Sequence, residues 1–155
     1  MALWDGQSNR RQVSTIADAR RDAHGVGLPL VLEPLPRGLD PYGAWVIEWA
    51  RAHASSGADL YKLPYPGSPS ACREVSALLD RPWALLSAGV SFETFLPQLE
   101  AAIGQGASGY IVGRAVWREA ATLDRDARSQ AIDDHVVPRL QRLADVSIPA
   151  RTTDP

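Results

Sequence analysis

The sequence is poor in cysteine, has no excess of positive charge and contains no long apolar run. Its 155 residues include a single cysteine, Cys72, which excludes an internal disulfide. The formal net charge of −2 leaves no basic surplus to match a nucleic-acid backbone. No run approaches the roughly 18 apolar residues of a membrane span, and the N-terminus lacks a signal-peptide pattern. These absences predict a reduced, cytoplasmic protein that binds neither nucleic acid nor membrane.

The remaining composition is that of one packed domain. Hydrophobic residues make up 45% of the chain and charged residues 22%, which excludes disorder over the whole chain. Of the 16 lysine and arginine residues, only Lys62 is a lysine. A GC-rich genome is one explanation of the arginine bias. A chemical need for an amine at Lys62 is the other.

Short apolar runs alternate with helical patterns along the chain. Consecutive runs end 25 to 29 residues apart, which is one strand and one helix each time and predicts an α/β fold with parallel pairing. The expected strands are 28–32, 58–63, 82–87 and 109–112. The expected helices are 10–24, 40–56, 70–80, 94–103, a short one through 117, and 124–146.

Several local details accompany this pattern. Asp5 to Asn9 has the composition of a polar turn. Asp40 is expected to cap a helix that starts at Pro41, and Thr94 to cap the helix that contains Pro97. Pro138 is expected to kink the last helix, whose apolar stripe contains Ile132, Val136, Leu140 and Leu143.

Packing expectations follow from the same residues. The apolar stripe Trp45, Trp49 and Ala52 predicts a core-facing helix surface. The strands are almost continuously apolar, which predicts a sheet covered on both faces.

Polar residues stand where the apolar strands end. These residues are Glu33, Lys62, Ser87 with Gly89, and Gly113 with Arg114. Reactive groups of α/β folds gather at the carboxyl ends of the strands. The sequence therefore predicts one site that combines a carboxylate, an amine, a hydroxyl and a guanidinium.

Lys62 and Glu33 are the candidate catalytic residues. Partial burial of a lysine favours the neutral amine, which attacks carbonyl carbon to form a Schiff base. A carboxylate at Glu33 could then transfer protons beside the imine. The alternatives are a lysine whose ammonium reaches solvent at the strand end, and a glutamate that serves as an ion-pair partner.

The other strand ends predict phosphate binding. Gly89 and Gly113 let backbone N–H groups approach an anion, and Arg114 adds a charged hydrogen-bond donor beside Ser87. Ordinary strand-to-helix turns are the alternative.

The sequence indicates neither a metal nor an organic cofactor. His24, His53 and His135 do not cluster, and Cys72 has no histidine partner that would activate it. Dinucleotide and nucleotide-phosphate fingerprints are absent.

Four sequence blocks resemble class I aldolases. Residues 56–62, 82–90 and 106–117, together with Leu32-Glu33-Pro34, occur in the order and spacing of the tagatose 1,6-bisphosphate aldolase family and its relative, sulfofructosephosphate aldolase. The resemblance covers about residues 2–146. It departs from the family at Pro64, where an acidic residue is common.

The resemblance implies a (β/α)₈ TIM barrel, an aldolase-type lyase that cleaves or forms a C–C bond of a ketose phosphate through an imine, without metal or cofactor. By resemblance, Lys62 is the Schiff-base lysine and Glu33 the acid/base. Ser87, Gly89, Gly113 and Arg114 would bind the substrate phosphate, as in dihydroxyacetone phosphate.

The same resemblance implies that the chain carries the C-terminal half of such a barrel. Strands five to eight and a stub of strand four at Leu3-Trp4 would form a partial domain over 1–146, with 147–155 as a disordered tail. A half-barrel has two open sheet edges, so a homo-oligomer or a complementary N-terminal half is expected. The alternative is a non-catalytic or truncated half that binds a sugar phosphate.

Overall fold

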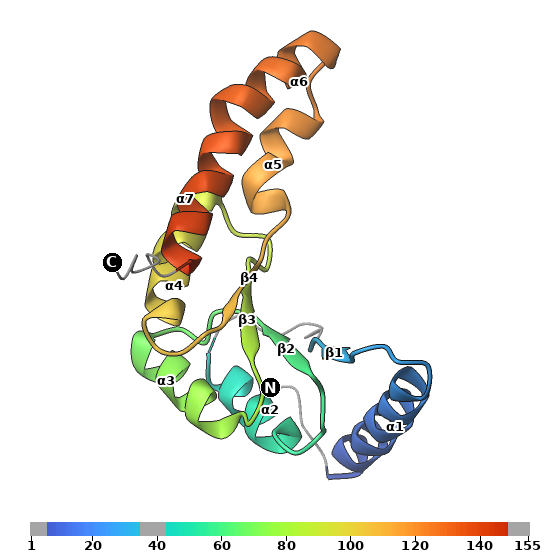
Figure 1. The fold of residues 1–155 in the computed structure, drawn as a ribbon. Coiled ribbons are helices and arrows are strands. Elements are labelled where there is room, and N and C mark those ends of the chain that lie inside the picture. The colour runs from blue at the N-terminus through green and yellow to red at the C-terminus, as the bar shows by residue number, and fades with distance from the viewer. Residues whose placement is uncertain (1–5, 35–42, 149–155) are drawn as a thin grey trace, which may run out of the picture.

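The computed structural model describes residues 6–34 and 43–148, with side chains from residue 14 onward (Figure 1). The elements are α1 (Gly6–Gly25), β1 (Val31–Leu32), α2 (Ala44–His53), β2 (Leu60–Leu63), α3 (Pro69–Leu78), β3 (Trp83–Leu86), α4 (Phe92–Ile103), β4 (Gly109–Ile111), α5 (Arg114–Ala121), α6 (Arg125–Ala131), the π-helical turn η1 (Ile132–Val136) and α7 (Val137–Ser147). Within these residues no helix is both long and apolar enough to cross a membrane.

The sheet has the predicted topology. Its strands lie in the order β1-β2-β3-β4, and every neighbouring pair is parallel. Helices connect each strand to the next, which places the carboxyl ends of all strands at one edge of the sheet. The prediction of an α/β fold with parallel, sequential strands is confirmed.

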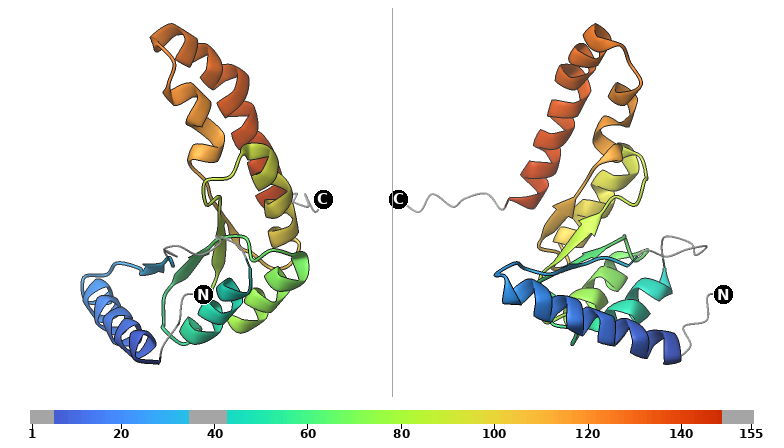
Figure 2. Two further views of the ribbon diagram at one scale, coloured as in Figure 1. Left: turned by 180° about the vertical axis from the view of Figure 1, so that it is seen from behind. Right: turned by 90° about the vertical axis from the view of Figure 1, so that its right-hand side faces the viewer.

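Helices cover one face of this sheet. α2, α3 and α4 pack side by side on that face (Figures 1 and 2). The core lies between these helices and the sheet, and its largest fully buried side chains include Tyr61, Leu63, Leu85, Phe95 and Leu99. The expectation that both faces are covered is therefore wrong for the described residues, because each connecting helix returns on the same side.

The first helix and strand differ from the expected ones. α1 begins at Gly6, because nothing in the polar stretch before Arg10 breaks a helix, and it stands apart at the β1 edge (Figure 2). β1 contains only Val31 and Leu32, and Leu28 is 60% exposed, because no described strand pairs with this edge. The stub expected at Leu3-Trp4 lies outside the described residues.

α2 begins at Ala44 after Gly43, later than the predicted start at Asp40-Pro41, and those two residues lie outside the described ones. Its buried face contains Val46, Trp49, Ala50 and His53, whereas Ala52 is exposed. Contact with β2 and α3 rotates the buried face of α2 by about one residue relative to the predicted apolar stripe. Trp49 is buried as predicted, and Trp45 packs at the margin of the core.

α4 begins one turn earlier than predicted. Ser91 is its N-cap, and the Ser91 hydroxyl accepts a hydrogen bond from the Thr94 N–H at 3.3 Å. Pro97 lies inside the helix rather than in its first turn, so one backbone hydrogen bond is missing. Burial of Phe92 in the added turn offsets that loss.

The last helices form an arm that projects from the sheet (Figures 1 and 2). Asp124 caps α6, as the predicted start at residue 124 requires, and η1 ends at Val136, two residues before Pro138. The wider turn accommodates a residue that lacks an N–H. Of the predicted stripe, Leu143 is buried on α4, whereas Ile132 and Leu140 are exposed because the arm extends beyond α4.

Candidate active site

Lys62 and Glu33 meet at the carboxyl ends of β2 and β1. The distance from Lys62 Nζ to Glu33 Oε2 is 2.7 Å, and both side chains are about one-quarter to one-third exposed. Leu32 pairs with Tyr61 in the sheet register, so Glu33 and Lys62 continue the same register by one residue. The structure therefore brings the predicted amine and carboxylate together at one edge of the sheet.

Alternation along β2 aims Lys62 at the face without helices. Tyr61 and Leu63 are fully buried against the helices, so the intervening Lys62 points to the opposite face. Its register partner on β3 is Ala84, whose own partner on β4 is Gly109. The two residues that lie beside Lys62 on β3 and β4 are therefore both small, which leaves room next to the Lys62 amine.

The loop after β3 forms a second feature of this edge. The Val90 N–H donates to the Ser87 carbonyl at 3.0 Å, and Ala88 and Gly89 both have positive φ, 47° and 86°. Positive φ at both central residues is the pattern of a type I′ turn. Ser87, which begins the turn, is buried.

Two arginines from α5 reach this turn. A Cβ placed on Gly89 would lie 3.8 Å from Arg114 Nη2 and 3.9 Å from Arg118 Nη2. Arg118 Nη2 also donates to the Gly89 carbonyl at 2.8 Å. Gly113 precedes α5, and no side chain caps that helix N-terminus. The structure thus brings Gly89 and Arg114 together, as an anion site requires, with Gly113 and Ser87 at the same sheet edge.

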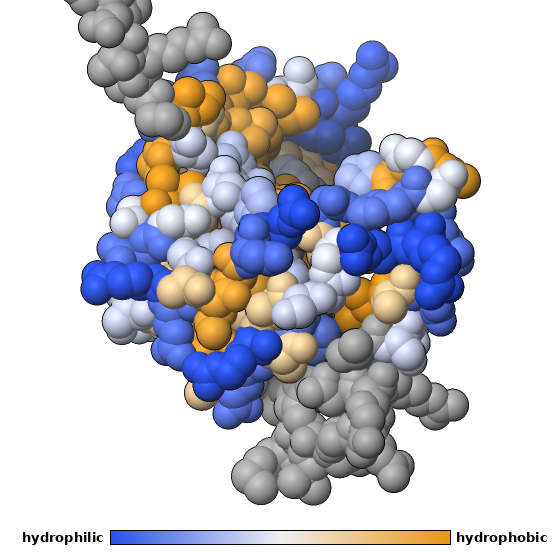
Figure 3. Space-filling view, turned by 60° about the horizontal axis from the view of Figure 1, so that its bottom comes forward, coloured by the Kyte–Doolittle hydropathy of each residue, from blue (hydrophilic) through white to orange (hydrophobic). Residues whose placement is uncertain are grey.

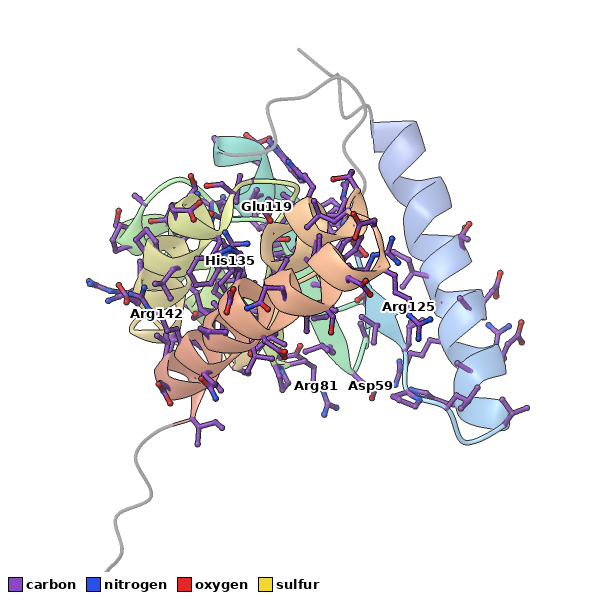
Figure 4. The ribbon with its side chains drawn as sticks, turned by 90° about the horizontal axis from the view of Figure 1, so that it is seen from above. Asp59, Arg81, Glu119, Arg125, His135 and Arg142 are labelled. Carbon is purple, nitrogen blue, oxygen red and sulfur yellow. The ribbon has the colours of Figure 1, made fainter. Side chains whose placement is uncertain are left out.

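The opposite edge of the sheet carries different residues. Asp59 and Arg81 lie near each other at the amino ends of β2 and β3 (Figure 4). The Asp59 carboxylate contacts His24 Nε2 at 2.8 Å and accepts from the Leu30 N–H at 2.8 Å. Hydrogen bonding to His24, followed by that from Leu30, lowers the pKa of Asp59 below its usual range. This cluster attaches α1 to the sheet, away from Lys62.

The other candidate groups have structural environments. Burial raises the pKa of the Cys72 thiol to about 11, which makes it a poor nucleophile. His53 is buried and stacked on Trp49, with ring centroids 4.3 Å apart, and burial lowers its pKa. Within the described ranges, no three histidine, cysteine, aspartate or glutamate side chains are grouped to hold a metal.

Two features of the site were not predicted from the sequence. Arg118 follows Arg114 by four residues, a spacing that places both on one helix face and could have indicated it. The left-handed conformation of Ala88 had no such signal, because alanine does not favour positive φ.

The fold and this edge define an aldolase-like domain, with a lysine and a carboxylate at neighbouring strand ends of a parallel α/β sheet. Residues 1–119 match the model of the DeoC/LacD family of aldolases, and the chain belongs to this family.

Three curated relatives show how far the similarity extends. It is 35% identical over 123 residues to the class 1 fructose-bisphosphate aldolase of Halobacterium salinarum, covering 75% of this chain and 47% of the relative. Identity to the enzyme of the same name from Thermoproteus tenax is 33% over 110 residues, covering 66% and 42%. A 2-amino-3,7-dideoxy-D-threo-hept-6-ulosonate synthase of Archaeoglobus fulgidus is 37% identical over 93 residues, covering 59% and 35%. The chain spans less than half the length of these relatives.

Solved structures agree. A Schiff-base-forming fructose-1,6-bisphosphate aldolase matches with a TM-score of 0.69 and 28% identity, over 89% of this chain and 52% of that one. An archaeal fructose-1,6-bisphosphate aldolase with its catalytic lysine bound to a carbinolamine intermediate matches with a TM-score of 0.65 and 28% identity, over 88% and 52%. The described strands correspond to part of an aldolase TIM barrel. The narrower resemblance to tagatose 1,6-bisphosphate and sulfofructosephosphate aldolases stays a prediction.

Proposed function

We propose that this chain is the C-terminal half of a class I aldolase that cleaves or forms a C–C bond of a ketose phosphate. The observation that carries the proposal is the 2.7 Å contact between the Lys62 amine and the Glu33 carboxylate at adjacent strand ends. In this assignment β1 to β4 are barrel strands five to eight. We assign residues 1–146 to the partial barrel domain, and α7 continues to Ser147, one residue past that boundary.

Lys62 is the proposed nucleophile. Its neutral amine attacks the ketose carbonyl carbon, and loss of water gives an imine. As the bond between the α and β carbons of the protonated imine breaks, its electrons move toward the imine nitrogen and leave an enamine, while the β-hydroxyl gives up its proton and becomes the carbonyl of the released aldehyde. Glu33, which already shares a hydrogen bond with the amine, would move protons during dehydration and cleavage. No metal or organic cofactor takes part.

The substrate phosphate is assigned to the turn after β3 and to the start of α5. Arg114 supplies charge and hydrogen-bond donors, and backbone N–H groups near Gly89 and Gly113 supply further donors. Ser87 ends β3 beside them. The convergence of Arg114 and Gly89 supports this assignment, because an ordinary strand-to-helix turn does not need a nearby guanidinium.

A second candidate function is favoured by one observation. The sheet face that carries Lys62 has no covering element among the described residues, and the chain spans less than half of its curated relatives. A non-catalytic half-barrel that binds a sugar phosphate would have the same geometry. For catalysis we propose that a second copy or a separate N-terminal half completes the pocket, in the cytoplasm.

Borohydride trapping separates the two functions. The 155-residue chain is incubated with dihydroxyacetone phosphate and sodium borohydride, and peptides are analysed by mass spectrometry. We expect a reduced adduct on Lys62 and none in Lys62→Arg, because a guanidinium stays charged and is a poor nucleophile. An unmodified Lys62 in a chain that still binds the phosphate would contradict the aldolase and favour the non-catalytic half-barrel.

A further inference from the structure

The turn between β3 and α4 holds a strained residue. Ala88 has φ of 47° and is the only residue other than glycine with positive φ in the described part of the chain. Alanine is disfavoured there because its Cβ crowds the following carbonyl. A strained residue persists only where its surroundings hold it in place.

Arg118 is the side chain of α5 that forms a hydrogen bond with this turn. Its Nη2 donates to the Gly89 carbonyl at 2.8 Å, although Gly89 and Arg118 are 29 residues apart in the chain. Arg114 lies one helical turn earlier on α5, on the same helix face. Figure 1 shows the β3–α4 loop beside the first turns of α5. One helix thus reaches the turn with two guanidinium groups.

The two arginines use their donors differently. Arg118 is engaged with the Gly89 carbonyl, whereas Arg114 makes no hydrogen bond or ion pair within the described residues. In the same residues, the N–H groups of Ala88 and Gly89 donate to no backbone carbonyl. The donors left available beside Gly89 are therefore those of Arg114 and of the turn itself.

We propose that Arg118 is a positioning residue for the phosphate site, holding the Ala88–Gly89 turn in its left-handed conformation so that the turn amides face the same anion as Arg114. This inference rests on the proposed function, because it assumes that a phosphate binds there. Arg118 acts through the turn, and its own guanidinium contributes no contact with the phosphate.

An NMR titration of the 155-residue chain tests this role. Dihydroxyacetone phosphate is added while the amides of residues 88–90 and 113–114 are followed. Arg118→Ala should weaken binding by about fivefold, because the turn loses the hydrogen bond that holds it, and should speed amide exchange at 88–90. Arg114→Ala should weaken binding without changing that exchange. Arg128→Ala is the matched control. Arg128 also donates to a loop carbonyl, that of Leu123, but it lies on α6 and not at the turn after β3.

Ala88→Gly separates positioning from direct contact. Glycine adopts positive φ without strain, so in the Ala88→Gly background removal of Arg118 should weaken binding by less than about twofold. A loss of about fivefold in both backgrounds would show that Arg118 binds the anion itself and would overturn the inference. Unchanged affinity in Arg118→Ala would also overturn it and leave the phosphate site standing. If the native chain shows no shifts at these amides, the phosphate site of the proposed function fails.

Discussion

At the scale of single residues, neighbouring side chains of β2 alternate between the candidate active site and the core. Lys62 points to the face without helices and contacts Glu33, whereas Tyr61 and Leu63 are buried among the helices. The Tyr61 hydroxyl donates to the His53 carbonyl at 2.8 Å, and burial raises its pKa. Tyr61 therefore fixes the strand segment that presents the amine.

Removing this hydroxyl should cost stability. Tyr61→Phe leaves buried carbonyl groups at His53 and Ala54 with one partner fewer, which we expect to lower the free energy of unfolding by about 1–2 kcal/mol. Urea denaturation followed by tryptophan fluorescence measures the change. Tyr110→Phe is the control, because the Tyr110 hydroxyl makes no hydrogen bond in the described structure, although its ring packs on Phe95. Equal losses in the two variants would contradict the role given to Tyr61.

At the scale of elements, α1 differs from the other helices in how it is attached. It stands beside the β1 edge and not over the sheet (Figures 1 and 2). The described side chains of α1 are mostly exposed, and its last turn is tied to the sheet through His24 and Asp59. Asp59 also accepts from the Leu30 N–H, so one carboxylate joins α1, the approach to β1 and the start of β2.

This attachment should weaken in acid. The folded-state pKa of Asp59 is lowered, so its stabilising contribution is present above its ordinary value near 4 and is lost as pH falls through the lowered folded value. Asp59→Asn should reproduce the acid state at neutral pH, and we expect several-fold faster trypsin cleavage after Arg20 and Arg21. Asp18→Asn removes the same charge within α1, where Asp18 pairs with exposed Arg21 and with no other described cation, and should leave cleavage nearly unchanged. Similar acceleration in both variants would refute the attachment.

At the scale of the whole molecule, one face of the sheet has no described covering element, and no further described strand pairs with either edge. Val31 on the β1 edge is 48% exposed, and Ile111 on the β4 edge is 37% exposed. Viewed from below, by contrast, the surface mixes hydrophilic residues with small apolar patches (Figure 3). Apolar strands with open edges pair readily with other strands.

We expect the purified chain not to be a stable monomer. Size-exclusion chromatography with light scattering should show a dimer or larger species, unless a separate N-terminal half is supplied. Val31→Lys and Ile111→Lys place charges on the two edges and should shift the population toward monomer. Val26→Lys is the control, since Val26 is exposed in the loop after α1. A monomer with cooperative melting in the native chain would contradict the expectation.

The sequence determined the parallel order of the strands and the residues at their ends. Short apolar runs at regular intervals indicate parallel strands joined by helices, and polar residues end such runs where the strands reach water. Glu33 and Lys62 could therefore be placed in one site from the sequence. Element boundaries depended on tertiary contacts. Ser91 rather than Thr94 caps α4 because Phe92 gains burial, and α2 is turned by its contact with the sheet.

Only the tertiary structure decided which residues far apart in the chain share a site. The approach of Arg118 to Gly89 depends on how α5 lies against the loop after β3, next to the positive φ of Ala88. Composition and periodicity report local burial, and they carry no signal for the hydrogen bond that joins an α5 side chain to the loop after β3. The covering of a single sheet face was likewise decided by packing, because an apolar strand has the same sequence whether one face or both faces are covered.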